Sequence, residues 1–281
     1  MPLTLMYITN NPDIALIAEH AGVDRIFVDM EYIGKTERQG HIDSVQNHHT
    51  VEDVKAIRNV LTKADLLVRV NPIHEATNEY CSSEEEVRAV IDAGADIIML
   101  PFFKTVAEVK RFIACVDGRA KASLLMETPD AVASADAIIA VPGIGEIHIG
   151  LNDLSLGYGK TFMFELLCDG TIEKLCLKFK YSGIPYGFGG IASIGSGRLK
   201  AETILKEHYR LGSSMVILSR SFCNVNKEKD NDYIREKFEI GIRSMRAFEK
   251  EIEIHSRYFK ENEIILAKTV KEIVDSIKLE K

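Results

Sequence analysis

Residues 121–159 read KASLLMETPDAVASADAIIAVPGIGEIHIGLNDLSLGYG, and this stretch decides the fold that the sequence predicts. It contains two short apolar runs, Ala122–Met126 and Glu146–Ile149, which are typical of buried β-strands. A carboxylate follows each run, Glu127 after the first and Asp153 after the second. If the strands are parallel neighbours, both acids emerge at one edge of the sheet, where they could hold a hard cation such as Mg²⁺ or Mn²⁺. The competing interpretation is a helix-capping acid and a turn acid, which is the commoner role of such residues.

The chain on either side of this stretch continues the alternation of short apolar strands with amphipathic helices. Eight strands are predicted, at residues 3–8, 25–29, 66–70, 96–100, 122–126, 146–149, 185–188 and 214–218. Eight strands in βα alternation favour a parallel sheet closed into a (β/α)8 TIM barrel. The rival is an open, doubly wound sheet. It would need a glycine-rich loop after the first strand, and Ile8–Pro12 contains no glycine.

The C-terminal part of the chain differs from the rest. From residue 225 it is charged, has a helical period and contains no clear strand. Its apolar positions Ile240, Met245, Phe248 and Ile252 predict that it docks on a surface. We therefore expect a catalytic barrel over residues 1–222 and a C-terminal helical extension over 223–281. This extension would pack on the barrel or on a neighbouring subunit of a homo-oligomer.

The composition excludes several classes of protein. The 281 residues are 46% hydrophobic and 27% charged, as in an ordinary globular protein. The net charge of −7 does not suggest the basic surface that nucleic-acid binding requires. There is no signal-peptide pattern, and no apolar run approaches the ~20 residues of a membrane span. The five cysteines are scattered without CxxC spacing, which fits a reducing cytoplasm.

Catalysis in such a barrel belongs to the C-terminal ends of the strands. The residues predicted there include Asp29, Glu31, Arg69, Glu127 and Asp153. This convergence of acids with an arginine favours the metal site over the capping interpretation. No lysine lies at a clear strand end near these acids, so an aldolase that forms a Schiff base is less expected.

The loops after the last two strands suggest an anion site. Residues 189–197 are rich in glycine and serine and include Gly190, and Arg220 lies between two serines after the eighth strand. TIM barrels often bind phosphate in these two loops. The hypothesis is a phosphorylated or otherwise anionic, sugar-like substrate, or phosphoenolpyruvate itself. The alternative is a flexible loop with a structural arginine.

Several motifs, taken in order, resemble the HpcH/HpaI aldolase/citrate lyase family. They are VDxE after the second strand, LVRVNP at the third, AGADIIMLPF at the fourth, and then METPDAV and IGLNDLSLGYG, over roughly residues 1–222. The resemblance implies a TIM barrel of the phosphoenolpyruvate/pyruvate type. It also implies a divalent-metal-dependent lyase that makes or breaks a carbon–carbon bond next to a 2-oxo acid such as pyruvate.

The resemblance also assigns roles to residues of this chain. Glu127 and Asp153 match the family's metal ligands, and Arg69 matches the arginine that supports the enolate and the carboxylate. Asp29 and Glu31 match the acids of the second βα loop. From the chemistry of the residues themselves, backbone N–H groups of Gly150, Leu151 and Asn152 could bind the substrate carboxylate at a helix start.

Two departures from the family pattern concern the general base. Where the family carries a histidine after the acid that Glu31 matches, this chain has Tyr32, a phenol that stays protonated at neutral pH. The segment that follows contains His41, His48 and His49, and we hypothesise that His49 or another of these supplies the base. Where the family tends to carry a glutamine two residues before the metal glutamate, this chain has leucine.

Two other functions remain open. One is a citrate-lyase-like enzyme that cleaves a CoA thioester, which should need a basic groove for the nucleotide. The other is a non-catalytic barrel that binds an anionic metabolite, an alternative that the missing family histidine keeps open.

Overall fold

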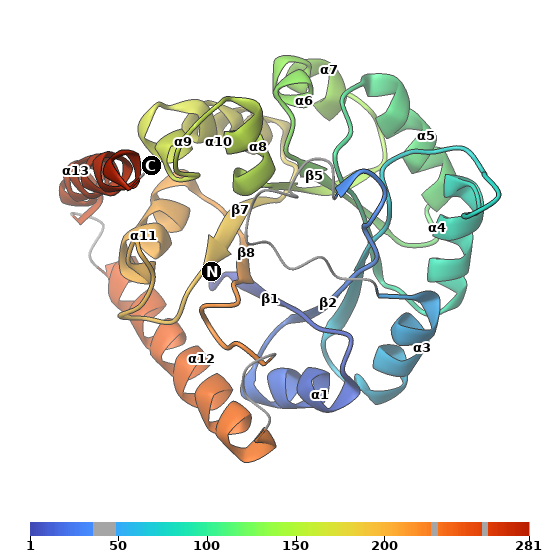
Figure 1. The fold of residues 1–281 in the computed structure, drawn as a ribbon, viewed down its shortest axis with the longest axis horizontal. Helices are drawn as coiled ribbons and strands as arrows, with labels where there is room; N and C mark the ends of the chain where they lie inside the picture. Colours follow the sequence, from blue (N-terminus) through green and yellow to red (C-terminus); the bar gives the residue numbers. More distant parts are fainter. Residues whose placement is uncertain (36–48, 226–229, 255–257, 281) are drawn as a thin grey trace.

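The computed structural model describes residues 1–35, 49–225, 230–254 and 258–280. Eight parallel strands form a closed barrel in the order of the sequence (Figure 1). They are β1 Thr4–Ile8, β2 Arg25–Asp29, β3 Asp65–Arg69, β4 Ile97–Leu100, β5 Lys121–Met126, β6 Ile144–Ile149, β7 Tyr186–Ile191 and β8 Met215–Leu218. The predicted (β/α)8 barrel is confirmed, and β5 and β6 are neighbours as the opening stretch indicated.

Helices surround the barrel. They are α1 Pro12–Ala21, α3 Val51–Val60, α4 Ser83–Asp92, α5 Val106–Val116, α6 Pro129–Ala133, α7 Ala135–Ile139, α8 Leu151–Gly157, α9 Glu165–Cys168, α10 Thr171–Ser182 and α11 Ala201–Leu211. The amphipathic pattern of the sequence predicts a single helix over residues 162–181, and this prediction is wrong, because α9 and α10 are separate. Gly170 between them has a φ of 81°, in the left-handed region that ends a right-handed helix.

The side chains of each strand alternate between two cores. Residues that point outward join a large cluster with the helices, whereas Met6, Phe27, Leu67, Ile97, Met99, Leu125 and Met215 fill the barrel interior. Toward the N-terminal end, Arg25 of β2 reaches Glu146 of β6 with a bidentate ion pair at 2.7 and 3.0 Å. The interior is therefore packed, and open space is left at the C-terminal mouth.

Two long helices follow the barrel, α12 Asn231–Ile254 and α13 Tyr258–Leu279. In Figure 1, α12 lies along α1 and α11, and α13 lies beside α9 and α11. Met245 and Ile252 are buried within this chain, whereas Ile240 is half exposed. Most of the apolar face of α12 is therefore covered by the chain's own barrel. The homo-oligomer stays a prediction.

Within the described ranges, none of the helices has both the length and the apolar character that a membrane crossing requires.

Candidate active site

A cavity of about 740 Å³ opens at the C-terminal mouth of the barrel. It brings together ten of the residues that the sequence singled out: Asp29, His49, Arg69, Glu127, Gly150, Leu151, Asn152, Asp153, Gly190 and Arg220. Glu31 is absent from this lining, because its side chain is fully buried behind it. The predicted acids and the arginine thus share one cavity, while Glu31 acts on it through its neighbours.

The first side of the cavity, which we call the β2–β3 wall, consists of Asp29, Glu31, Lys35 and Arg69. The Nε and Nη2 of Arg69 each donate to one oxygen of Asp29 at 2.8 Å, and its Nη1 lies 3.4 Å from Glu31 Oε2. Burial lowers the pKa of Arg69, but the charges of Asp29 and Glu31 outweigh it and raise that pKa. The guanidinium is therefore a fixed cation with a fixed orientation.

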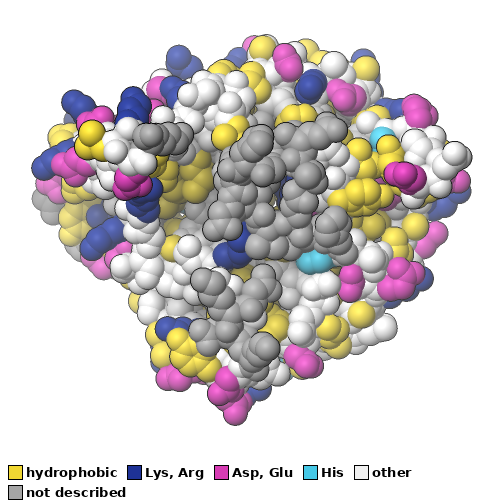
Figure 2. Space-filling model, viewed as in Figure 1, with side chains coloured by type: hydrophobic (Ala, Val, Ile, Leu, Met, Phe, Trp, Pro, Cys, Tyr) yellow, Lys and Arg dark blue, Asp and Glu magenta, His cyan; other side chains and the backbone are white. Residues whose placement is uncertain are grey.

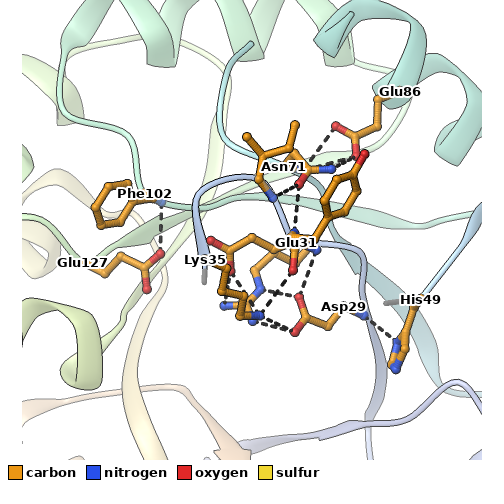
Figure 3. A network of polar contacts seen from close by, with 11 residues as sticks. Asp29, Glu31, Lys35, His49, Asn71, Glu86, Phe102 and Glu127 are labelled. Atoms are coloured by element: carbon orange, nitrogen blue, oxygen red, sulfur yellow. Dashed lines mark hydrogen bonds and ion pairs between the residues drawn. The ribbon is translucent and has the colours of Figure 1, made fainter. Parts of the chain in front are cut away.

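The sequence analysis expected no lysine at a clear strand end near the acids, but Lys35 reaches them from the loop after β2. Its side chain is 5% exposed and lines the cavity, with Nζ 3.0 Å from Asp29 Oδ2 and 3.5 Å from Glu31 Oε2 (Figure 3). Sequence reasoning missed it because Lys35 lies six residues beyond the end of β2. The available signal was its spacing of four residues from Glu31, which returns the side chain to that acid across one turn.

The start of this loop is held by a clamp behind the wall. Asn71 Oδ1 accepts the backbone N–H groups of Tyr32 and Ile33 at 2.9 and 3.0 Å, and Asn71 Nδ2 donates to Glu86 Oε1 at 2.7 Å. Burial raises the pKa of Glu86, which is 6% exposed. The clamp sets where Glu31 and Lys35 point. Glu86 lies on α4, and nothing in the sequence linked it to this loop.

His49 is oriented unfavourably for the predicted role of general base. The backbone N–H of Asp29 donates to its Nδ1 at 3.0 Å, so the neutral ring carries its proton on Nε2. Burial lowers the pKa of His49, against the opposing charge of Asp29. The ring is thus a neutral N–H donor with no free lone pair. His41 and His48, the other two candidates for the base, lie outside the described residues. The pKa of Tyr32 is raised, first by burial and then by the charge of Glu86, so its phenol stays protonated as expected.

The opposite side of the cavity, which we call the β5–β6 wall, consists of Glu127, Gly150 and Asp153. The backbone N–H of Phe102 donates to Glu127 Oε1 at 3.0 Å, and Phe102 adopts a left-handed φ of 48° to do so. Glu127 is 3% exposed, and burial raises the pKa of its carboxyl well above its ordinary value. The charges of Glu31 and Asp153 raise it further.

Gly150 makes room for the Glu127 carboxylate. A Cβ atom at position 150 would lie only 2.5 Å from Glu127 Oε2, closer than real Cβ contacts allow. The absence of a side chain at Gly150 therefore permits the close approach of Glu127. Leu151 and Asn152 follow in the first turn of α8, and both line the cavity.

The β5–β6 wall fits a hard divalent cation through its donor set. It presents carboxylate oxygens, and burial together with the charges of Glu31 and Asp153, which raise the pKa of Glu127, disfavours a bare carboxylate that a cation would stabilise. Within the described ranges, no three histidine, cysteine or carboxylate side chains come together as a complete metal cage. Glu127 and Asp153 would therefore have to share the ion with water and substrate, as Mg²⁺ sites commonly do.

His148 is a buried residue of the cavity that the sequence analysis missed. It points into the barrel from β6, and its Nε2 lies 3.0 Å from the carbonyl oxygen of Gly189. Burial lowers the pKa of His148 to about 4, so the ring is neutral and Nε2 donates. It holds the backbone of β7 in place at Gly189 and Gly190. A histidine inside an apolar strand was the available signal.

Arg220 lies where this cavity meets a second one of about 920 Å³. The second cavity is lined by the loops after β7 and β8 and by α12, and five of its lining residues are serines: Ser193, Ser196, Ser219, Ser221 and Ser244. In the part of the chain that the structure describes, the Arg220 guanidinium forms no hydrogen bond or ion pair. The two predicted anion-binding loops therefore meet at a cation beside the main cavity.

The closed barrel and the acidic cavity at its mouth define a TIM barrel of the enzyme type, in which chemistry takes place at the C-terminal ends of the strands. The chain belongs to the HpcH/HpaI aldolase/citrate lyase family, whose family model matches residues 3–165. This confirms the resemblance of the motifs. The comparison with curated proteins found no match.

Solved structures of this family share the fold. The HpcH/HpaI aldolase from Desulfitobacterium hafniense DCB-2 is 18% identical, with a TM-score of 0.60 over 78% of this chain and 86% of that one. The citrate lyase beta subunit from M. tuberculosis, in complex with oxaloacetate and magnesium, is 14% identical, with a TM-score of 0.58 over 84% and 97%. The citrate synthase SbnG is 16% identical, with a TM-score of 0.57 over 78% and 87%.

Proposed function

We propose that this protein is a divalent-metal-dependent carbon–carbon lyase of the class II aldolase type. It would cleave or form a bond next to a 2-oxo acid such as pyruvate. One observation carries the proposal: Glu127, in a family of aldolases and lyases, is buried beside Asp153 and faces the same cavity as the fixed cation Arg69. This arrangement suits a substrate that develops negative charge on its oxygens.

The residues have distinct parts in this proposal. Glu127 and Asp153 would hold Mg²⁺ or Mn²⁺, and the ion supplies a Lewis acid for the carboxylate and keto oxygens of the 2-oxo acid. Arg69, aligned by Asp29, donates to the same oxygens as charge builds on them. Gly150 keeps Glu127 in place, and the backbone N–H groups of Leu151 and Asn152 would orient the substrate carboxylate.

The second cavity supports a substrate longer than pyruvate. An anionic group at the far end of the aldehyde half, such as the phosphate of a sugar-derived substrate, would bind Arg220 and the serine hydroxyls. Gly190 lines the main cavity, and a Cβ atom at this position would lie 3.5 Å from the carbonyl oxygen of Ile217. The phosphate hypothesis predicts a lower KM for a phosphorylated aldehyde than for its unphosphorylated form, and loss of that difference in Arg220→Gln.

The two alternatives make different predictions. A CoA-thioester lyase would need basic residues for the nucleotide, and on the face in Figure 2 the described acidic and basic side chains are interspersed around the rim. A non-catalytic barrel would bind an anionic metabolite without turnover.

We further propose that the protein forms a homo-oligomer and lies in the cytoplasm. Size-exclusion chromatography with light scattering would test the first, and fractionation of cells would test the second.

The decisive experiment is pyruvate release from hydroxy-oxo acids by the full chain, with and without Mg²⁺ or Mn²⁺. We expect activity that requires the cation and disappears in Asp153→Asn. Turnover in the presence of a chelator, or turnover of acyl-CoA substrates alone, would overturn the proposal. Binding of the 2-oxo acid without turnover of any tested substrate would favour the non-catalytic barrel.

A further inference from the structure

Lys35 presents an ammonium group with a donor to spare. Its Nζ donates to Asp29 Oδ2 at 3.0 Å and to the backbone oxygen of Glu31 at 3.4 Å. An ammonium has three N–H donors, so one remains for another oxygen. The side chain is almost fully buried, yet it belongs to the lining of the main cavity. Among the described residues, the spare donor has the nearby Glu31 carboxylate, 3.5 Å away, as its remaining neighbour, and it can also meet a group that enters this cavity.

The position of Lys35 in the barrel decides which part of a substrate it meets. Lys35 follows β2 and Asp153 follows β6, and in a closed barrel of eight strands β2 and β6 stand opposite one another. A 2-oxo acid bound through a cation on Glu127 and Asp153 would have its carboxylate and keto oxygens at the β5–β6 wall. The rest of its carbon chain must extend across the mouth, toward β2. The oxygen on the far side of the reacting carbon–carbon bond is then the one that faces Lys35.

We infer that Lys35 is a catalytic residue that donates a proton to the carbonyl oxygen of the aldehyde half. This inference rests on the proposed function. As the methyl carbon of the pyruvate enolate attacks the aldehyde carbon, the new carbon–carbon bond forms. The C=O π electrons move to the aldehyde oxygen. Lys35 Nζ–H gives its proton to that oxygen, which becomes the product hydroxyl, and the resulting amine takes a proton from water.

The cleavage direction is the same sequence reversed. The Lys35 ammonium first releases one proton to solvent, and the resulting amine then accepts the hydroxyl proton while the carbon–carbon bond breaks, which leaves the aldehyde and the enolate. Asp29 and Glu31 position the Lys35 ammonium and also hold Arg69, so one pair of carboxylates sets both donors. Arg69 ends β3, which is nearer to β5 around the barrel than β2, the strand that Lys35 follows. Arg69 is therefore assigned to the pyruvate half of the substrate and Lys35 to the aldehyde half.

The assignment is tested by measuring two half-reactions in the same full-length protein. The first is exchange of pyruvate methyl protons in D₂O with Mg²⁺, followed by NMR, which needs only the enolate. The second is addition of pyruvate to glycolaldehyde, which needs both halves. For Lys35→Met we expect addition to fall by about 100-fold or more, the usual contribution of an acid–base group, while exchange stays within about threefold of the wild type. Methylammonium should restore part of the addition rate in Lys35→Ala.

Lys35→Arg serves as the matched control because it keeps the positive charge beside Asp29 and Glu31. It should preserve the thermal midpoint and the exchange rate, yet recover little addition, since guanidinium gives up its proton poorly. If Lys35→Met adds at the wild-type rate, or loses exchange and addition in parallel without amine rescue, Lys35 is only a counter-ion and the inference is wrong. If the wild type catalyses neither half-reaction with any divalent cation, the proposed function itself fails and the inference fails with it.

Discussion

The two walls of the mouth balance their charge in different ways. On the β2–β3 wall, two carboxylates meet two cations, Arg69 and Lys35, within 3.5 Å. On the β5–β6 wall, the buried Glu127 feels the negative charges of Asp153 and Glu31, and its pKa is raised. The charges of the first wall are therefore balanced within the chain, whereas the second has excess negative charge that a bound cation would offset. This difference suggests that side chains of the folded protein supply the proton and hydrogen-bond donors, whereas a bound ion would supply the Lewis acid.

The largest expected effect comes from removing one carboxylate of the β5–β6 wall. We expect Glu127→Gln to lose cation binding and about 10³-fold or more in turnover, because Lewis-acid stabilisation is worth several kcal/mol. The fold should persist and the cation-free protein should become more stable, since an amide removes the repulsion with Asp153. Calorimetric Mg²⁺ titration and thermal unfolding would measure both effects. Retained Mg²⁺ affinity in this variant would mean that the cation site lies elsewhere.

A change on the opposite wall should separate binding of the cation from use of the substrate. Arg69→Lys keeps the charge but cannot bond both oxygens of Asp29, so we expect kcat/KM to fall by about 10²-fold. Mg²⁺ affinity should change by less than about threefold, because Arg69 is not a ligand. Steady-state kinetics and the same titration would measure the two quantities. A parallel loss of both would show that the walls are not independent.

A smaller effect on the β5–β6 wall comes from packing alone. In Gly150→Ala the new methyl group collides with Glu127 Oε2, so we expect the carboxylate to shift and Mg²⁺ affinity to fall by about tenfold, or about 1.4 kcal/mol. The matched substitution Gly190→Ala has its nearest contact at 3.5 Å and should leave Mg²⁺ affinity nearly unchanged. Equal affinities in the two variants would contradict the role assigned to Gly150.

The raised pKa of Glu127 predicts a pH dependence with a definite sign. The folded protein holds this proton to a higher pH than the unfolded chain. Without a cation, its free energy of unfolding should therefore fall as pH rises from the ordinary carboxyl range toward the raised pKa. Mg²⁺ competes with the same proton, so its affinity should rise by up to about tenfold per pH unit in that window. Titrations at several pH values would test this, and an affinity independent of pH would contradict it.

The smallest expected effect concerns a helix cap beside the β2–β3 wall, and it tests whether stability there can change without a change in cation binding. Thr50 caps α3 directly after His49, and its hydroxyl accepts the N–H of Asp53 in a capping box. Thr50→Ala should cost about 1 kcal/mol of stability, as lost caps usually do. Mg²⁺ affinity should not change. A marked loss of affinity would indicate that this wall also helps to form the cation site.

By itself, the sequence determined the barrel and most of the cavity lining. Short apolar runs placed all eight strands, because a parallel strand that is buried on both faces is apolar along its length. The positions of the strand ends placed Asp29, Arg69, Glu127 and Asp153 at one mouth of the barrel. The sequence did not reveal the break between α9 and α10. The amphipathic pattern continues on both sides of Gly170, so the glycine alone did not indicate that the helix ends there.

Only the tertiary structure decided how the charges pair. Lys35 joins Asp29 and Glu31, Glu86 supports their loop through Asn71, and the hydrogen bond from Asp29 turns His49 into a donor. Periodicity reports which face of an element is buried, but partners and tautomers depend on loops and on elements far apart in the chain. A charge in a loop has no periodic signal, so its partner is defined only when the closed barrel brings the two together.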